Sequence, residues 1–553
     1  MTHVHEQIVE MTTTQYKLDQ SAKPVEPRFD AVIVGAGFAG MYMLHRLRGL
    51  GLKVRVLETG SDVGGTWYWN RYPGARCDVE SVQYSYQFSE DLQQEWEWSE
   101  RYATQPEILR YANHVADRFD LRRDIQFNCR VRAMAFDDAA AQWSVELDDG
   151  TRLRADYCVM ATGCLSAPNR PRIPGLDSFA GPVYLTGNWP HEPVSFAGLR
   201  VGVIGTGSSA IQAIPLIAKE AAHLTVFQRS ANYTVPAHNA PLAPELRRQI
   251  KRDYCAMRER AKQMPNGLDF CFNSKSALDA TREERQREYT ARWRDGGVAF
   301  MGAFGDLLFN PESNRTAAEF VHSKIREVVC DPKVADLLSP RNIIGCKRLC
   351  VDTDYYATFN RPNVELIDVS ETPIEAITSK SIRAHGREFE VDALVLATGF
   401  DAMTGALSRI DIRGREGRAL AQKWRDGPRA YLGLAVEGFP NLFTVTGPGS
   451  PSVLTNMLPS IEQHVDWIAD CIAHLRARGI ARIEAQADAE ANWVAHVNEV
   501  AGISLRSTCG SWYVGANIPG KTRVFMPYIG GFPVYVKKCV EVAQSGYAGF
   551  RLG

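Results

Sequence analysis

The chain has 553 residues, 45% hydrophobic and 23% charged, with 63 basic and 64 acidic side chains. Such a length predicts roughly two to four globular domains. The balanced charge lacks the electrostatic footprint of a protein that binds nucleic acid or an anionic membrane, so small molecules are the expected partners. No apolar run reaches the length of a signal peptide or a membrane span, which favours a cytoplasmic protein.

The cysteines and the N-terminus carry no sequence motif. Twelve cysteines are scattered without a CxxC pair or a zinc spacing, and Cys346 with Cys350 comes closest to one. Free, mostly buried thiols in a reducing compartment, with no metal site, are the preferred interpretation. Residues 1–28 are polar, contain two prolines and are expected to form a flexible or surface-laid arm.

The stretch from Asp30 to Glu58 predicts a dinucleotide cradle. A hydrophobic strand at 31–34 leads into a glycine turn, an amphipathic helix and a second strand at 53–57. The residues of the turn assigned to the cofactor are Gly35, Gly37, Phe38, Ala39 and Gly40. Such glycines permit the tight turn, close approach of a pyrophosphate and close helix packing. Glu58 can accept hydrogen bonds from the hydroxyls of an adenosine ribose.

A second cradle follows the strand at 201–204. Its candidate residues are Gly205, Thr206, Gly207, Ser208, Ser209 and Gln212. Where the first cradle has its acid, this one has Gln228 followed by Arg229. An arginine there can pair with a 2′-phosphate, which favours NADPH, although it could also be a surface residue at a strand end. FAD is therefore expected in the first cradle and NADP in the second.

The predicted fold is α/β, with two Rossmann-like dinucleotide-binding domains and a helical insertion. Similar strand-turn segments end near residues 163 and 399 and suggest that the chain leaves the first domain and returns to it. The predicted domains are FAD-binding at 29–165 and 396–553, NADP-binding at 166–240 and 340–395, and a helical insertion at 241–339. The arginines of the insertion are interleaved with acids, which favours a solvated helical surface over a site for an acidic partner.

The aromatic, glycine-rich loop at 64–78 has no regular period and is expected to line a site. Its candidate cofactor residues are Gly65, Thr66, Trp67, Tyr72 and Asp78. A disulfide reductase would need a cysteine pair beside the flavin, and this loop offers only Cys77. Oxygen chemistry instead needs a closed aromatic site and a fixed cation. Arg348, oriented by Asp78, is the candidate, although a structural buried salt bridge would have the same sequence.

The segment from Phe179 to Pro190 resembles the fingerprint of the type I Baeyer–Villiger monooxygenases, FxGxxxHxxxW followed by Pro or Asp. The loop at 65–78 is similar to that family's second signature. The resemblance covers nearly the whole chain from about residue 28 and is closest to phenylacetone and steroid monooxygenases. It implies the following roles: Arg348 as catalytic arginine, Asp78 as its supporting aspartate, Arg229 and Lys347 as 2′-phosphate contacts, and Trp512 beside the nicotinamide ribose.

The resemblance also implies an activity. NADPH reduces FAD, dioxygen adds at the flavin C4a, and the resulting peroxide attacks a ketone to give an ester or lactone, with possible sulfoxidation and no metal. The segment Pro451, Ser452, Val453 and Leu454 resembles the bulged loop of phenylacetone and steroid monooxygenases. It favours arylalkyl, linear or bulky and cyclic ketones. Dioxygen is the second small-molecule partner, and a monomer is favoured.

One position departs from the fingerprint, because Leu185 stands where the family has histidine. The leucine side chain makes no hydrogen bond. It either replaces the histidine structurally, by packing, or weakens the coupling between domain motion and NADPH use. Two other functions stay open. A flavin-dependent N- or S-oxygenase would use the same cofactors, and an uncoupled NADPH oxidase or non-catalytic flavoprotein would tolerate Leu185.

Overall fold

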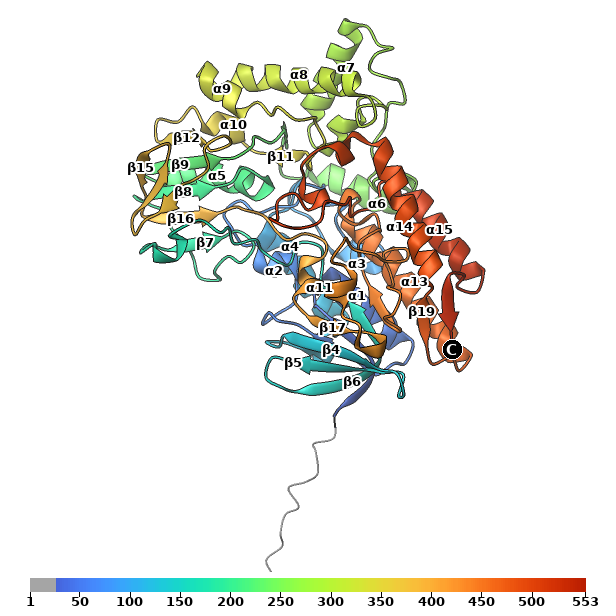
Figure 1. The fold of residues 1–553 in the computed structure, drawn as a ribbon. Coiled ribbons are helices and arrows are strands. Elements are labelled where there is room, and N and C mark those ends of the chain that lie inside the picture. Colours follow the sequence, from blue (N-terminus) through green and yellow to red (C-terminus); the bar gives the residue numbers. More distant parts are fainter. Residues whose placement is uncertain (1–25) are drawn as a thin grey trace, which may run out of the picture.

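The computed structural model describes residues 26–553 and contains two main β-sheets surrounded by helices (Figure 1). The larger sheet has eight strands in the order β17-β4-β5-β6-β1-β2-β3, with β18 also paired to β6. Its strands are β1 (Arg28–Val34), β2 (Val54–Leu57), β3 (Ile125–Gln126), β4 (Val131–Asp137), β5 (Gln142–Leu147), β6 (Arg152–Met160), β17 (Asp411–Arg413) and β18 (Leu442–Thr444). The arm predicted at 1–28 lies outside the described residues except for its last three, of which Arg28 begins β1.

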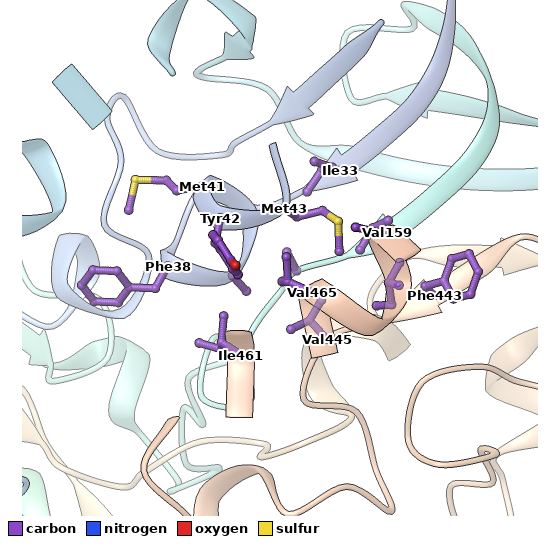
Figure 2. Packing of buried hydrophobic residues seen from close by; sticks show 14 of the residues in the cluster. Ile33, Phe38, Met41, Tyr42, Met43, Val159, Phe443, Val445, Ile461 and Val465 are labelled. Atoms are coloured by element: carbon purple, nitrogen blue, oxygen red, sulfur yellow. The ribbon is translucent and has the colours of Figure 1, made fainter. Parts of the chain in front are cut away.

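The core beside this sheet is built from segments that lie far apart in the sequence. Helix α1 (Phe38–Gly49) packs against helix α13 (Met457–Ala477), which is separated from it by about 400 residues. Figure 2 shows side chains of α1, β1, β6 and α13 in one apolar cluster, among them Met43, Val159 and Val465, each fully buried. Burying one such side chain contributes about 1.5–3 kcal/mol, so α13 is an integral part of the first fold unit.

The second sheet is entirely parallel, with five strands in the order β12-β9-β8-β16-β7. They are β7 (Val183–Leu185), β8 (Arg200–Ile204), β9 (His223–Gln228), β12 (Val364–Asp368) and β16 (Ala393–Leu396). Helix α5 (Ser208–Glu220) connects β8 to β9, as a dinucleotide-binding unit requires. Two such units confirm the predicted α/β fold; the division of the chain into domains stays a prediction.

Four helices lie between β10 (Thr234–Pro236) and β11 (Cys350–Asp352), and in Figure 1 most of them gather at the end of the molecule opposite β4, β5 and β6. They are α6 (Pro244–Lys262), α7 (Arg282–Asp295), α8 (Pro311–Val328) and α9 (Pro332–Leu338). The prediction that the arginines of this insertion lie on a solvated surface is wrong for Arg258, which is 4% exposed. Its guanidinium donates to the Gln83 carbonyl at 3.0 Å and to Ser85 Oγ at 2.6 Å, and so ties α6 to the first unit.

Two further predictions are corrected. The expectation of free thiols throughout is wrong for Cys346 and Cys509, which form a disulfide across 163 residues. The other ten cysteines are free, as expected, and seven of them are buried. The loop at 64–78 contains a one-turn helix, α2 (Thr66–Trp69), where no regular structure was expected. Within residues 26–553, no helix combines the length and the apolar character needed to cross a bilayer.

Candidate active site

One cavity of about 2510 Å³ is lined by both glycine turns, the loop at 64–79 and the C-terminal residues 507–519. Pockets for one small molecule measure about 300–1,000 Å³, so this cavity has room for more than one ligand. It brings together nearly all the predicted site residues. The four that do not line it are Gly40, Pro451, Ser452 and Leu454.

The first glycine turn is shaped for a close approach at the N-terminus of α1. Gly35 has φ +104°, and a Cβ there would lie 2.6 Å from the Ala161 carbonyl oxygen. A Cβ on Gly40 would lie 1.8 Å from the Gly35 oxygen, so Gly40 serves helix packing and does not face the cavity. Gly37 lines the cavity at the helix start, where free backbone N–H groups suit a pyrophosphate.

Glu58 lies in the cavity wall at the end of β2 and is 6% exposed. Its two carboxylate oxygens accept hydrogen bonds from the backbone N–H groups of Ala36 and Gly60, each at 2.7 Å. Burial raises the pKa of Glu58, although these N–H groups oppose the shift. A carboxylate has about four acceptor positions, so Glu58 retains capacity for ribose hydroxyls.

Aromatic side chains close the first cradle. Trp67 of α2 is 7% exposed, and its indole N–H donates to the Tyr84 hydroxyl at 3.1 Å. The rings of Phe38 and Trp67 both pack edge-on against Tyr84, with centroids 6.1 and 5.9 Å away. Gly65 and Thr66 complete this part of the wall. Such a wall excludes water from a bound isoalloxazine-sized ring.

The second glycine turn has the same local geometry. Gly205 has φ +112°, and a Cβ there would lie 2.5 Å from the Ala397 carbonyl oxygen. A Cβ on Gly207 would meet nothing within 4 Å, so the start of α5 opens onto the cavity. Thr206 Oγ1 donates to the Ser230 carbonyl at 2.9 Å, and the Ser208 hydroxyl lies 3.1 Å from Cys350 Sγ. Ser209 also lines the cavity.

Two cations gather at the end of β9 without an acid. Within residues 26–553, neither Arg229 nor Lys347 forms an ion pair with a carboxylate. Lys347 Nζ donates to Ser230 Oγ at 2.7 Å. Burial lowers the pKa of Lys347, and the neighbouring charge of Arg229 lowers it further. An anion between them would relieve this repulsion, which is the chemistry of a phosphate monoester site.

Arg348 and Asp78 form the ion pair that sequence reasoning could only guess. Nη2 of Arg348 donates to Asp78 Oδ1 at 2.8 Å, Nε donates to Oδ2, and Nη1 donates to the Val453 carbonyl at 2.9 Å. The side chains are 28% and 19% exposed. Burial disfavours the charged guanidinium, but Asp78 outweighs it and the pKa of Arg348 is raised. Arg348 is thus a permanent cation in the cavity wall, with N–H groups left for a ligand.

The predicted substrate loop is only partly turned toward the cavity. Val453 lines it, whereas Pro451 and Ser452 are buried and Leu454 packs against the apolar cluster that contains Val453. Thr455, Met457 and Ile461 also form the wall. Trp512 lines the cavity too, and its ring centroid lies 4.2 Å from that of buried Tyr513.

Leu185 ends β7, where it pairs in parallel register with Leu396 of β16. Its side chain packs against an apolar cluster that contains Leu396 and Ile204, and it also lines the cavity. A leucine therefore suits this position by packing. Cys509, by contrast, was missed, because a partner 163 residues away leaves no local signal.

Comparison with known proteins gives one consistent assignment. Residues 32–266 match the family described as pyridine nucleotide-disulphide oxidoreductase. A Baeyer-Villiger monooxygenase from Pseudooceanicola batsensis is 42% identical, over 96% of this chain and 97% of its own. A phenazine N-monooxygenase from Lysobacter antibioticus is 41% identical, over 95% and 97%.

The structural comparison agrees over the same length. The solved structure of an oxidized steroid monooxygenase bound to NADP is 52% identical, with a TM-score of 0.91 over 95% of this chain and 99% of that one. Identity at this level across almost the whole chain confirms the resemblance carried by the fingerprint segment and the loop at 65–78. The chain belongs to the Baeyer–Villiger monooxygenase family.

Proposed function

We propose that this chain uses FAD, NADPH and dioxygen to insert one oxygen atom beside a ketone carbonyl, giving an ester or lactone. The observation that carries the proposal is the position of Arg348. A permanently charged guanidinium, oriented by Asp78, lies in the wall of a cavity shared by two nucleotide cradles. The loop at 64–78, which follows the first cradle, holds a single cysteine, Cys77, and its thiol is free.

The first cradle fits FAD. Gly37 exposes backbone N–H groups for the pyrophosphate, Glu58 has acceptor capacity for the ribose, and Trp67 shields the ring side. When bound and reduced, a flavin supplies the activation of dioxygen. The protein's contribution is to place the ligand and to keep water away from it.

The second cradle fits NADPH in preference to NADH. The acid that would repel a 2′-phosphate is replaced by Gln228, whose side chain donates to the Leu337 carbonyl at 2.7 Å. Arg229 and Lys347 supply positive charge instead, and Gly207 leaves the helix start open for the pyrophosphate. Trp512, which also lines the cavity, would cover the nicotinamide end.

Arg348 would stabilise the negative oxygen that develops when a ketone carbonyl is attacked. Because the Asp78 carboxylate accepts from both Nε and Nη2, the direction of the guanidinium is fixed before substrate binds, and preorganised charge is the main source of such stabilisation. The hydrogen bond to the Val453 carbonyl adds a link to the substrate loop. A change in that loop that moves the Val453 carbonyl would therefore act on Arg348.

The apolar residues of the cavity wall that contains Arg348 support apolar ketones as substrates. Val453, Met457, Ile461 and Trp512 offer hydrophobic surface there. We therefore propose arylalkyl, linear or bulky and cyclic ketones. Three exposed free cysteines, Cys255, Cys271 and Cys330, support a reducing compartment such as the cytoplasm.

An N-oxygenase is the second candidate, because the phenazine N-monooxygenase is as similar to this chain as the Baeyer-Villiger enzyme. The test is NADPH consumption by the FAD-loaded protein with a panel of ketones and a panel of aromatic N-heterocycles. Ester, N-oxide and hydrogen peroxide are measured together. Ester that matches NADPH supports the proposal. N-oxide without ester reassigns the substrate class, and peroxide alone identifies an uncoupled oxidase.

A further inference from the structure

The disulfide between Cys346 and Cys509 joins two segments of the active-site wall. Cys346 directly precedes Lys347 and Arg348, and Cys509 lies three residues before Trp512. Both cysteines line the cavity. The bond therefore ties the segment that carries the catalytic cation to residues 504–528, which we call the C-terminal loop.

The middle of the C-terminal loop depends on this bond. The loop is attached at its start by the N–H of Leu505, which donates to the Leu308 carbonyl at 2.9 Å, and by Arg506, whose Nε donates to the Gly345 carbonyl at 2.9 Å. Further on, Asn517 donates to the Phe400 carbonyl at 2.7 Å. Within residues 26–553, every hydrogen bond of residues 507–516 stays inside the loop. Apart from the main chain itself, the disulfide is thus the only covalent or hydrogen-bonded link from this stretch to described residues outside the loop.

The other side of the loop is held by apolar packing. Tyr513 and Val514 belong to a cluster with Val453 and Met403. The disulfide links the stretch that carries Trp512 to the segment of Lys347, and the apolar cluster links the same stretch to the substrate loop. Breaking the disulfide would leave only the apolar side, and a stretch with so few polar attachments opens readily.

This bond is also placed for exchange. Cys509 is only half-buried, so a small dithiol that enters the cavity can reach it, whereas Cys346 is 1% exposed. Ten other cysteines of the chain remain free, three of them exposed. Where most thiols are reduced, a single disulfide is more often a redox-sensing bond than a permanent one.

We propose that Cys346 and Cys509 form a redox-modifiable site whose disulfide clamps Trp512 over the nicotinamide end of the cavity and whose reduction releases it. In the oxidising direction, one thiol attacks hydrogen peroxide, the O–O bond breaks, and a sulfenic acid and water form. The second thiol then attacks that sulfur and releases a second water, so two thiols are oxidised and the peroxide is reduced. In the reducing direction, a dithiol exchanges with the bond and becomes a disulfide itself.

The effect on NADP rests on the proposed function, whereas the existence of the bond and its hold on the loop do not. The full-length, FAD-loaded protein is prepared without reductant and compared with the same protein treated with dithiothreitol. Thiols are counted in denaturant, the linked peptides are identified by mass spectrometry, tryptic cleavage after Lys521 and Arg523 is timed, and NADP⁺ affinity is measured by titration. The untreated protein is expected to show ten free thiols of twelve.

Reduction is expected to speed cleavage of the loop and to weaken NADP⁺ binding roughly three- to tenfold, because preorganisation is lost. Stoichiometric peroxide should restore both. Cys509→Ser should match the reduced protein and ignore dithiothreitol, while Cys330→Ser, which removes an exposed thiol elsewhere, should respond like the unmodified chain. Twelve free thiols without reductant, or identical cleavage and affinity before and after reduction, would overturn the proposal. If no form binds NADP⁺, the proposed function fails, and thiol counts with cleavage rates still decide the clamp.

Discussion

The hydroxyl of Tyr72 donates a 2.8 Å hydrogen bond to Oε1 of Gln212, and so joins the loop after the first cradle to helix α5 of the second. The amide of Gln212 returns a 3.0 Å bond to the Arg76 carbonyl. Asp78 follows two residues later and orients Arg348. Tyr72 and Gln212 were both predicted to bind cofactor. The structure shows that they are hydrogen-bonded to each other, and this contact sets the position of the loop that carries Asp78.

Tyr72→Phe is expected to lower the rate of ester formation about two- to tenfold, the equivalent of one neutral hydrogen bond. Gln212→Ala should have a similar or larger effect, because it removes three hydrogen bonds of the tie, including the one that the Arg76 N–H donates to Gln212 Oε1 at 3.4 Å. The measurement is kcat for ester, together with the ratio of ester to NADPH consumed. If the two residues act through each other, the double variant equals Gln212→Ala alone. Additive losses would contradict the link.

Arg229→Ala is expected to weaken NADPH binding about 10- to 100-fold, the worth of a charged hydrogen bond, and to leave NADH binding unchanged. The reason is that Arg229 has no carboxylate partner among the described residues and is proposed to bind the 2′-phosphate. Affinities for both nucleotides are measured by titration. Lys219→Ala, an exposed lysine at the end of α5, is the matched control. Equal losses for NADPH and NADH would remove Arg229 from this role.

Glu462 predicts a pH dependence of stability. It is 8% exposed, and its Oε1 accepts hydrogen bonds from the N–H groups of Gln87 at 2.6 Å and Phe88 at 2.9 Å. Burial raises its pKa from 4.5 to about 7. The folded protein thus holds this proton more tightly than the unfolded chain, so the contribution to stability is full below pH 4.5 and is lost as the pH rises through about 7.

Glu462→Gln keeps an oxygen for both N–H groups and cannot ionise. The variant is therefore expected to have a higher melting temperature than the unmodified chain at pH 8, with the difference shrinking toward pH 5. Melting curves at the two pH values provide the comparison. A difference that is the same at both would show that Glu462 does not titrate in this range.

Leu185→His restores the fingerprint residue and separates the two interpretations of this position. The apolar contacts of Leu185 with the cluster around Leu396 favour substitution by packing. We therefore expect little change in NADPH affinity or in peroxide released per NADPH, and a modest loss of stability from placing an imidazole against an apolar cluster. A gain in coupling to ester formation would instead show that leucine weakens the use of NADPH.

What could be predicted from the sequence follows from how local each signal is. The cradles are local: glycine, helix start and strand end lie within about 30 residues, so Glu58 and Arg229 could be found by spacing. The pairing of Arg348 with Asp78 spans 270 residues, so the residues alone allowed it only as a candidate, which the family resemblance then supported. The disulfide and the buried Arg258 depend on contacts between distant segments, and the direction of Val453 depends on an irregular loop. Neither contacts between distant segments nor the conformation of an irregular loop can be predicted from local sequence periodicity.

The most direct test of the central claim is Arg348→Ala in the FAD-loaded protein. Flavin reduction by NADPH is followed by absorbance under anaerobic conditions, and ester and peroxide are then measured in air with a ketone that the unmodified chain converts. We predict flavin reduction at a rate close to that of the unmodified chain, ester formation reduced at least about 100-fold, and NADPH diverted to peroxide, because the charge that stabilises the attacked carbonyl oxygen is gone. A normal yield of ester from Arg348→Ala would contradict the account.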